Sequence, residues 1–308
     1  MTAGIKNRGI TSVITIFFNP GVFLEEAIES VFAQTENAWE LLLVDDGSED
    51  GSTETALHYE RLRPDKVRYL SHQGRVNLGM SASRNLGIQH ALGTWVAFID
   101  ADDVWFPTKI EEQRRLLESN PRADMLFGKY DVWYSWRKDA VQPDMCPDLP
   151  VLADTLTDPP ELALLCYPLG TKPAPSMSDL IIRKELLEQI GGFESQFTGM
   201  YEDQAFLIKA YLTATIYVSG QCWSRYRKHD HSCSTVTNQQ GNYHKSRFAY
   251  LRWLEGYLKR RVTHGAVSAA LEKAIWPYLH PRLHSASGLL RRAARFIKGK
   301  HPMNPSGA

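Results

Sequence analysis

The sequence is poor in cysteine, lacks long apolar runs and has no excess of charge of either sign. Four cysteines in 308 residues, with no signal-peptide pattern ahead of the first strand-like segment, predict free thiols and a cytoplasmic location. No apolar run approaches the ~20 residues that a membrane-spanning helix needs. Lys and Arg together number 35, as do Asp and Glu, so the net charge gives no indication of a nucleic-acid partner.

Segments with strand and helix patterns alternate through the first 120 residues. The strand candidates are rich in β-branched and apolar residues and lie at residues 12–18, 40–44, 67–70 and 94–99. Helices are expected at residues 23–34, between the turn at 45–48 and about Arg61, at 81–92 with Ser81 as the cap, and from Pro107 to about 119. This alternation predicts a mainly parallel sheet with helices on both faces, whose ligands bind beyond the carboxyl ends of the strands.

Two acidic clusters follow these predicted strands, at Asp45-Asp46 and at Asp100-Ala101-Asp102-Asp103. The first cluster is followed by Gly47-Ser48, and the sequence Asp-Gly-Ser is common in ordinary turns. This cluster alone therefore fits a plain turn as well as a binding site. In the second cluster three carboxylates within four residues repel one another, and a hard divalent cation would offset the repulsion. We therefore predict metal or phosphate chemistry at the second cluster.

The pattern of Asp100 and Asp102 fits two reactions. Haloacid-dehalogenase-type phosphohydrolases use the first Asp of D-x-D-x-[TV] as the phosphoryl acceptor, and residues 100–104 (DADDV) match that pattern. Nucleotide-sugar transferases instead use D-x-D to hold a metal that bridges the two phosphates of the donor. The phosphohydrolase motif normally ends the first strand of its domain, whereas three strand candidates precede it here, which favours the transferase.

Five blocks of sequence resemble glycosyltransferase family 2. In chain order they are SVIT at 12–15, AIESV at 27–31 with QT at 34–35, LVDDGS-x-DGS at 43–52, N-x-G-x-S-x-x-RN-x-GI at 77–88, and FIDADD at 98–103. The resemblance extends over residues 12–227. It implies an α/β protein with the GT-A fold, in which a mixed sheet flanked by helices joins a Rossmann-like nucleotide-binding half to an acceptor-binding half. It also implies inversion at the anomeric carbon.

The resemblance assigns roles to individual residues. Gly-Gly-Phe at 191–193 is followed by Glu202 and Asp203, which match the family's catalytic pair with Asp203 as the general base; helix-start acids would be the ordinary explanation. The implied nucleotide-binding residues are Ile16, Phe18, Asp45, Asp46, Arg84, Asp100 and Ala101, and the implied ligands of Mn²⁺ or Mg²⁺ are Asp100, Asp102 and His229. A structural salt bridge for Arg84 and an ordinary loop histidine at 229 remain open.

The expected partners follow from the same resemblance. The donor is a nucleoside-diphosphate sugar, with a UDP-sugar favoured, and the acceptor is a hydroxyl of a glycan, a lipid-linked glycan or another compound in surface polysaccharide or glycoconjugate synthesis. Residues 137–175, rich in Pro and Asp, fit an acceptor-binding insertion. Just before it, Trp133, Tyr134 and Trp136 fit either a sugar-stacking surface or an aromatic sheet edge.

We predict a catalytic domain over residues 1–235, with its two halves meeting near residue 120, and a helical C-terminal extension over 236–308. In the extension, residues 289–300 (LLRRAARFIKGK) combine an apolar face with basic side chains. Such a segment predicts either peripheral contact with an anionic membrane or a solvated terminal helix.

Three alternatives to the transferase fit the sequence less well. A sugar nucleotidyltransferase should carry a Gly-rich phosphate loop after its first strand, and Asn19-Pro20-Gly21 does not supply one. The phosphohydrolase is disfavoured by the position of its motif. A relative that binds nucleotide sugars without turnover would not need a base, so the presence of Asp203 argues against it.

Overall fold

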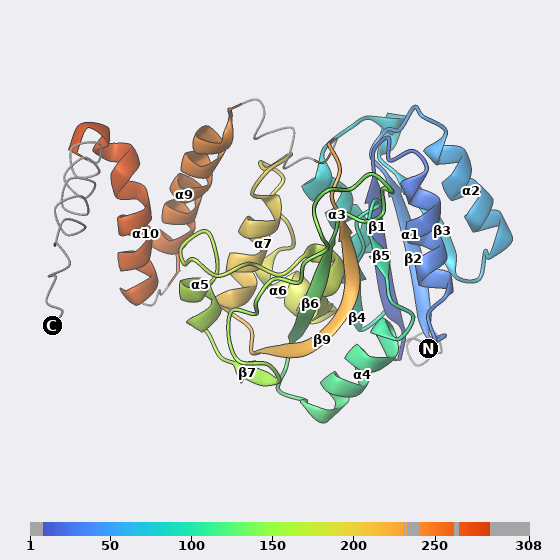
Figure 1. The fold of residues 1–308 in the computed structure, drawn as a ribbon, viewed down its shortest axis with the longest axis horizontal. Helices are drawn as coiled ribbons and strands as arrows, with labels where there is room; N and C mark the ends of the chain where they lie inside the picture. The colour runs from blue at the N-terminus through green and yellow to red at the C-terminus, as the bar shows by residue number, and fades with distance from the viewer. Residues whose placement is uncertain (1–8, 231, 233–240, 262–264, 284–308) are drawn as a thin grey trace, which may run out of the picture. The chain divides into compact units, whose positions relative to one another are not determined.

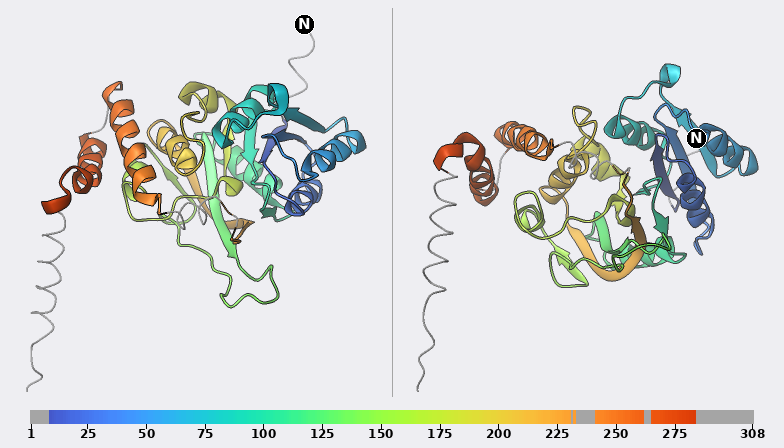
Figure 2. Two further views of the ribbon diagram at one scale, coloured as in Figure 1. Left: turned by 90° about the horizontal axis from the view of Figure 1, so that it is seen from above. Right: turned by 45° about the horizontal axis from the view of Figure 1, so that its top comes forward.

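The computed structural model describes residues 9–230, 232, 241–261 and 265–283. The chain forms two compact units, Met1–Ser246 and Arg247–Ala308, and each is considered by itself. In the first unit, nine strands among the described residues make one mixed sheet with helices on both faces (Figures 1 and 2). The order of strands in the sheet is β3-β2-β1-β4-β8-β6-β9-β5, and β7 pairs with β9.

The N-terminal part of the sheet is parallel. It consists of β1 (Thr11–Phe17), β2 (Trp39–Asp45), β3 (Val67–Ser71) and β4 (Trp95–Phe98). Every residue of β1 and β2 is buried, because helices cover both faces, and this explains their continuous apolar sequences. These four strands lie within one or two residues of the predicted ranges.

The second part of the sheet makes it mixed. Its strands are β5 (Val104–Trp105), β6 (Met125–Trp133), β7 (Thr155–Thr157), β8 (Ile181–Arg183) and β9 (Ile216–Arg227). β8 runs antiparallel to both β4 and β6, whereas β6 and β9 are parallel to each other. β8 therefore joins the two halves into one sheet.

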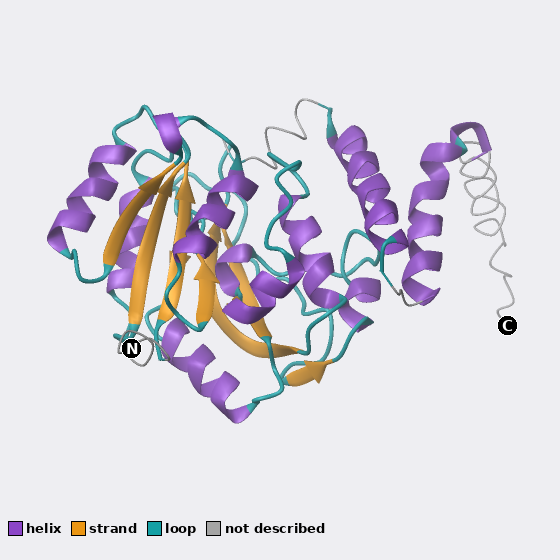
Figure 3. Cartoon of the chain, turned by 180° about the vertical axis from the view of Figure 1, so that it is seen from behind, coloured by secondary structure: helices purple, strands orange, loops and turns teal. Residues whose placement is uncertain are grey.

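The helices cover this sheet on its two sides (Figure 3). They are α1 (Phe23–Phe32), α2 (Ser52–Leu62), α3 (Met80–His90), α4 (Lys109–Ser119), α5 (Glu161–Leu165), α6 (Lys184–Ile190) and α7 (Glu202–Tyr211), with 3₁₀ turns η1 (Gln73–Arg75) and η2 (Met177–Asp179). The prediction of Ser81 as a helix cap is wrong. Gly79 occupies the cap position, and the Ser81 hydroxyl donates to the Phe197 carbonyl at 2.8 Å.

Residues 177–183 do not form one continuous strand. The chain there forms η2 and then the short strand β8, because Asp179 turns inward and accepts the backbone N–H of Gly128 at 2.6 Å. The fourth predicted helix begins at Lys109, two residues after Pro107, which lies in the preceding turn.

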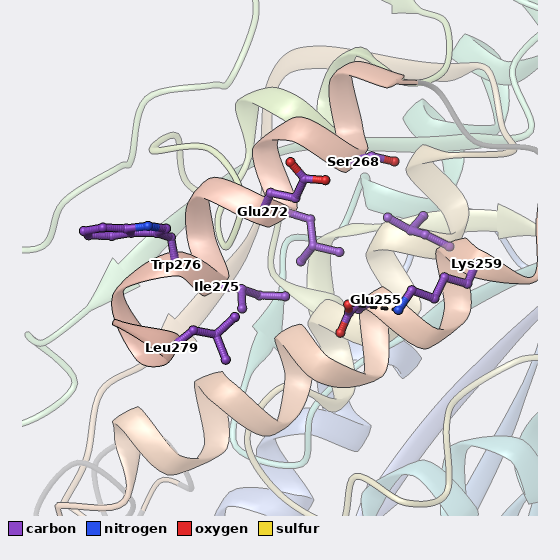
Figure 4. Close-up of a pocket in the computed structure, with 9 residues that line it drawn as sticks. Glu255, Lys259, Ser268, Glu272, Ile275, Trp276 and Leu279 are labelled. Carbon is purple, nitrogen blue, oxygen red and sulfur yellow. Dashed lines mark hydrogen bonds and ion pairs between the residues drawn. The ribbon is translucent and has the colours of Figure 1, made fainter. Parts of the chain in front are cut away.

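The second unit contains α10 (Gly265–Leu279) and most of α9 (Tyr243–Lys259). The rings of Phe248 and Tyr278 stack with their centroids 5.1 Å apart. A groove of about 360 Å³ separates the two helices, and Figure 4 shows Ile275 among the residues that line it. Residues 289–300, proposed from sequence as an amphipathic segment, lie outside the described residues. Within the described part, no helix combines the length and apolarity needed to cross a bilayer.

Candidate active site

The carboxyl ends of the parallel strands bring the acidic clusters to one edge of the sheet. Asp45 is the last residue of β2 and pairs in register with Phe17, the last residue of β1. β4 lies on the other side of β1, and the Ile99 N–H that follows it donates to the Ile14 carbonyl at 3.1 Å. Asp100 comes directly after Ile99, so both predicted clusters open onto the edge where ligands of such sheets bind.

Asp45 holds the turn that follows β2. Its carboxylate is buried and accepts four hydrogen bonds, from the backbone N–H groups of Gly47 and Ser48 and from the hydroxyls of Thr53 and Tyr69. A carboxylate with this many internal donors is committed to the turn geometry. The structure therefore places Asp45 as a support of the loop.

Asp46 fixes the start of α3 to the end of β2. Its two oxygens accept the backbone N–H groups of Leu78 and Gly79 at 2.8 and 3.0 Å. Ile16, also predicted to flank the nucleotide, is buried inside β1, whereas Phe18 is 52% exposed just beyond the strand. Among these three predicted residues, Phe18 has the most surface available to a base.

Arg84 joins the second acidic cluster to α7. Its side chain is only 3% exposed, and Nη2 lies 2.8 Å from Oδ1 of Asp100, while Nη1 donates to Oε1 of Glu202. Glu202 is 118 positions further along the chain, so this one guanidinium brings together two acidic segments that are distant in sequence. Burial raises the pKa of Asp100, and the nearby charge of Asp102 raises it further, while Arg84 opposes both effects.

The three acids of the second cluster have different surroundings. Asp103 is buried and accepts the Ser178 hydroxyl and the Arg227 N–H, the latter at 3.0 Å; burial raises its pKa well above the ordinary value. Asp102 has a side chain that is 28% exposed, with Oδ2 2.8 Å from Nε2 of His229. The structure thus brings together Asp102 and His229, both predicted as metal ligands, and gives Asp103 an internal position. Ala101, between Asp100 and Asp102, is buried.

Glu202 and Asp203 open α7 after Tyr201, whose φ of +73° makes a sharp entry into the helix. Burial raises the pKa of Glu202 to about 7, against the opposing effect of Arg84. Within the described residues no donor reaches its second oxygen, Oε2. Asp203 is more exposed, accepts the Gln204 N–H at 2.7 Å, and also has a pKa raised by burial. A raised pKa and an accessible oxygen suit a general base.

The residues around Asp102 are compatible with a hard divalent cation. Carboxylate oxygen and imidazole nitrogen are both ligands of Mn²⁺, and carboxylate suits Mg²⁺. In the part of the chain that is described, no group of three or more His, Cys, Asp or Glu side chains is arranged to hold a metal by itself. Such an ion would need further oxygen ligands from phosphate or water, as is usual where Mg²⁺ is bound together with a phosphorylated substrate.

Sequence reasoning missed two residues of this site. Ser178 donates to Asp103 and, through its hydroxyl, accepts the Asp100 N–H at 3.0 Å, but no local motif marks it. Arg227 belongs to an Arg-x-His pattern that ends at His229, and this spacing could have singled it out. Trp133 and Trp136, considered for sugar stacking, pack instead on the Arg227 guanidinium.

Comparison with known proteins identifies the family. The sequence model described as Glycosyl transferase family 2 matches residues 12–191, which is more than half of the chain and includes both acidic clusters. The chain belongs to glycosyltransferase family 2. The prediction of the family from the five sequence blocks is therefore confirmed, and the match ends before the acids of α7.

Curated relatives match about a third of the length of this chain. An uncharacterized glycosyltransferase of Rickettsia felis is 39% identical over 109 residues, which are 35% of this chain and 17% of the relative. The putative teichuronic acid biosynthesis glycosyltransferase TuaG of Bacillus subtilis is 36% identical over 107 residues, 34% of this chain and 41% of the relative. The chain thus spans less than half of these relatives.

Two solved structures share the fold of this chain. S. aureus TarS 1-349 in complex with UDP-GlcNAc has a TM-score of 0.62 and 20% identity, covering 88% of this chain and 72% of that one. Mannosyltransferase PcManGT from Pyrobaculum calidifontis in complex with GDP-Man and Mn²⁺ has a TM-score of 0.60 and 14% identity, covering 97% and 77%. These likenesses confirm the predicted GT-A fold class, a mixed sheet flanked by helices.

Proposed function

We propose that the chain is a metal-dependent, inverting glycosyltransferase that moves a sugar from a nucleoside-diphosphate sugar to an acceptor hydroxyl. The observation that carries this proposal is the pair of ion pairs made by Arg84, which holds Asp100 of the strand-end cluster and Glu202 of α7 on one side chain. A diphosphate site and a catalytic base must lie within the length of one sugar for direct transfer. The contacts of Arg84 with both acidic segments support this arrangement.

In the proposed reaction, Asp203 accepts the proton of the acceptor hydroxyl as its oxygen forms a bond to the anomeric carbon. On the opposite face of the sugar the bond from that carbon to the phosphate oxygen breaks, and its electron pair leaves with the nucleoside diphosphate. A sugar hydroxyl is too weak an acid to ionise beforehand, so the base acts in the transition state and contributes about 10²- to 10⁴-fold.

Asp102 and His229 are the residues that would hold Mn²⁺ or Mg²⁺, because their side chains meet at 2.8 Å and Asp102 remains partly exposed. When bound, such an ion neutralises negative charge on the departing diphosphate. Asp100 is held by Arg84 at the rim of the same cluster. Phe18, exposed beyond β1, is proposed to contact the base, and Asp46 and Arg84 to shape the walls of the nucleotide site.

The proposed donor is a UDP-sugar, and the proposed acceptor is a hydroxyl of a glycan or lipid-linked glycan in surface polysaccharide synthesis. TarS is solved with UDP-GlcNAc, and TuaG is described as a teichuronic acid biosynthesis enzyme. PcManGT, with GDP-Man, represents the guanine alternative. Both donors share the diphosphate that the acidic cluster would face.

Replacing Asp203 by Asn tests the proposed base. Asn keeps the size of the side chain but cannot accept the proton as a carboxylate does, so nucleoside diphosphate release from UDP-GlcNAc or GDP-Man, with water as acceptor, should fall by about 10²- to 10⁴-fold. The variant should still be stabilised by UDP or GDP with Mn²⁺ in a thermal unfolding assay. Donor release is measured by a coupled nucleotide assay.

Asp65→Asn is the matched control, because Asp65 is exposed in the turn before β3 and pairs only with Arg63 among the described residues. It should release nucleotide at the wild-type rate. Wild-type rates in Asp203→Asn would remove Asp203 from the role of base, and loss of nucleotide stabilisation would show that it acts in donor binding.

A further inference from the structure

A buried arginine at the end of β9 contacts the acidic turn from behind. The side chain of Arg227 is 2% exposed. Its Nε donates to the backbone carbonyl of Asp102 at 2.7 Å, and its own backbone N–H donates to Oδ1 of Asp103 at 3.0 Å. Arg227 therefore holds two consecutive residues of the cluster through two different groups.

The guanidinium of Arg227 is itself held by an aromatic cage, which we define as Phe23, Trp133 and Trp136. Its central carbon lies 4.6 Å from the ring centroid of Phe23, 4.5 Å from that of Trp133 and 5.2 Å from that of Trp136. Nη2 is paired with Glu26 of α1. Aromatic faces and one carboxylate thus compensate a cation that has been removed from water.

The cage comes from α1, from the end of β6 and from the segment that follows β6. Phe23 and Glu26 belong to α1, Trp133 ends β6, and Trp136 follows it and donates from Nε1 to the Lys228 carbonyl at 2.8 Å. Phe23 also contacts His229, with ring centroids 5.3 Å apart. The support that fixes Arg227 therefore extends to the histidine that faces Asp102.

Two features of this arrangement point beyond fold stability. The hydrogen bond from Nε is made to the carbonyl of Asp102, whose own carboxylate is partly exposed toward His229. The backbone N–H of the same residue donates to Oδ1 of Asp103, so one residue holds both the main chain of Asp102 and the side chain of Asp103. Groups in this position, one contact behind a metal ligand, commonly set the ligand's orientation and basicity.

We propose that Arg227 is a positioning residue that holds the Asp102–Asp103 turn in the geometry required to bind a divalent cation together with a nucleoside diphosphate. This proposal rests on the proposed function, because it assigns the same turn to the cation. The aromatic cage serves it by fixing the guanidinium plane, so Trp133 and Trp136 support the donor site and are not a sugar-stacking surface.

The test measures Mn²⁺ affinity by electron paramagnetic resonance of free Mn²⁺, with UDP and in parallel GDP present. Arg227→Met should weaken Mn²⁺ binding by about 10- to 100-fold, which is the usual effect of losing a group behind a metal ligand. Arg227→Lys keeps the charge but not the planar set of donors, and should lose affinity by about tenfold. The Mn²⁺ affinity of Arg227→Lys therefore tests the proposal if Arg227→Met does not fold.

Arg225→Met is the matched control, because Arg225 lies two residues earlier on β9 and also stacks on Trp133, at 5.2 Å, with no contact to the side chains of the acidic turn among the described residues. It should bind Mn²⁺ like the wild type. Folded Arg227 variants with wild-type Mn²⁺ affinity, even if their melting temperature falls, would overturn the proposal and leave the proposed function standing. A wild type that binds no Mn²⁺ with either nucleotide would overturn both.

Discussion

Glu202 and Asp203 are adjacent in sequence, yet their carboxylates have different surroundings. Glu202 is buried against Arg84, and Asp203 is partly exposed at the first turn of α7. Different surroundings give neighbouring carboxylates different roles, as is common in active sites. On this basis Glu202 is best explained as a structural partner of Arg84, while Asp203 keeps the predicted role of base.

The raised pKa of Glu202 predicts a pH dependence of stability. Because its pKa rises from 4.5 in the unfolded chain to about 7 in the folded protein, the folded state binds this proton more tightly. The contribution of Glu202 to the free energy of unfolding is fully present below pH 4.5 and is lost as the pH rises to about 7. The free energy of unfolding of the wild type should therefore fall relative to Glu202→Gln across this interval, by about 3 kcal/mol at most.

Urea unfolding at intervals from pH 4 to 8 measures this difference. Glu188→Gln, at a largely exposed position of α6, controls for the substitution itself. A constant difference between wild type and Glu202→Gln across the whole range would show that Glu202 titrates alike in both states.

At this scale the sequence could predict residue types and several pairings, but not which atoms are available. Asp102 and His229 were predicted to bind one metal ion, and their side chains lie 2.8 Å apart in the structure, which is compatible with that prediction. Asp45 and Asp46 were predicted as equivalent candidates, although Asp45 proves to be saturated by four donors. Those donors include Tyr69, 24 positions away, and no local pattern specifies such a contact. The roles in binding and catalysis stay predictions.

The packing of α3 on β1 depends on a glycine. A Cβ at Gly87 would lie 2.6 Å from Cγ2 of Ile14, a buried β-branched residue that cannot turn its side chain away. Gly87 belongs to the N-x-G-x-S block that carries the family resemblance, and this contact gives the glycine a physical reason. The close approach also brings Arg84, one turn earlier on α3, near the end of β4.

Gly87→Ala should therefore destabilise the first unit by about 1–3 kcal/mol through overpacking, despite the higher helix propensity of Ala. The matched control is Gly256→Ala in α9, where the nearest atom to the new Cβ would be the side-chain Nη1 of Arg260 at 3.7 Å. That change should be neutral or stabilising by up to about 1 kcal/mol. Thermal and urea unfolding measure both; equal stability of Gly87→Ala and wild type would contradict the packing argument.

Elements with long patterns were predictable from sequence, and very short ones were not. β1, β2 and β4 lie close to the predicted ranges because nearly all of their residues are buried and most are apolar. β3 is mostly half-buried, but its short run of Val67, Tyr69 and Leu70 was enough to mark it. β5 has two residues and β7 three, too few to show any period. Both are defined by pairing with β9, more than 50 positions away.

For the whole molecule, the mixed sheet is what assembles the candidate site. Parallel β4 delivers Asp100 and Asp102, and β9, across β8 and β6, delivers Arg227 and then His229. α7 carries Glu202 and Asp203, and Arg84 of α3 contacts Glu202. The predicted division near residue 120 separates β4 from β9 and α7. The candidate site, however, is made of residues from both sides of that division.

Nucleotide binding by wild type and Asp102→Ala, followed by isothermal titration calorimetry with and without Mn²⁺, tests the central claim most directly. UDP is the first ligand and GDP the parallel one. The wild type should bind one of them with Mn²⁺ and at least about tenfold more weakly without it, and Asp102→Ala should lose this dependence on Mn²⁺. Equal binding by both proteins, or binding that Mn²⁺ does not change, would contradict a cation-bridged diphosphate at Asp102.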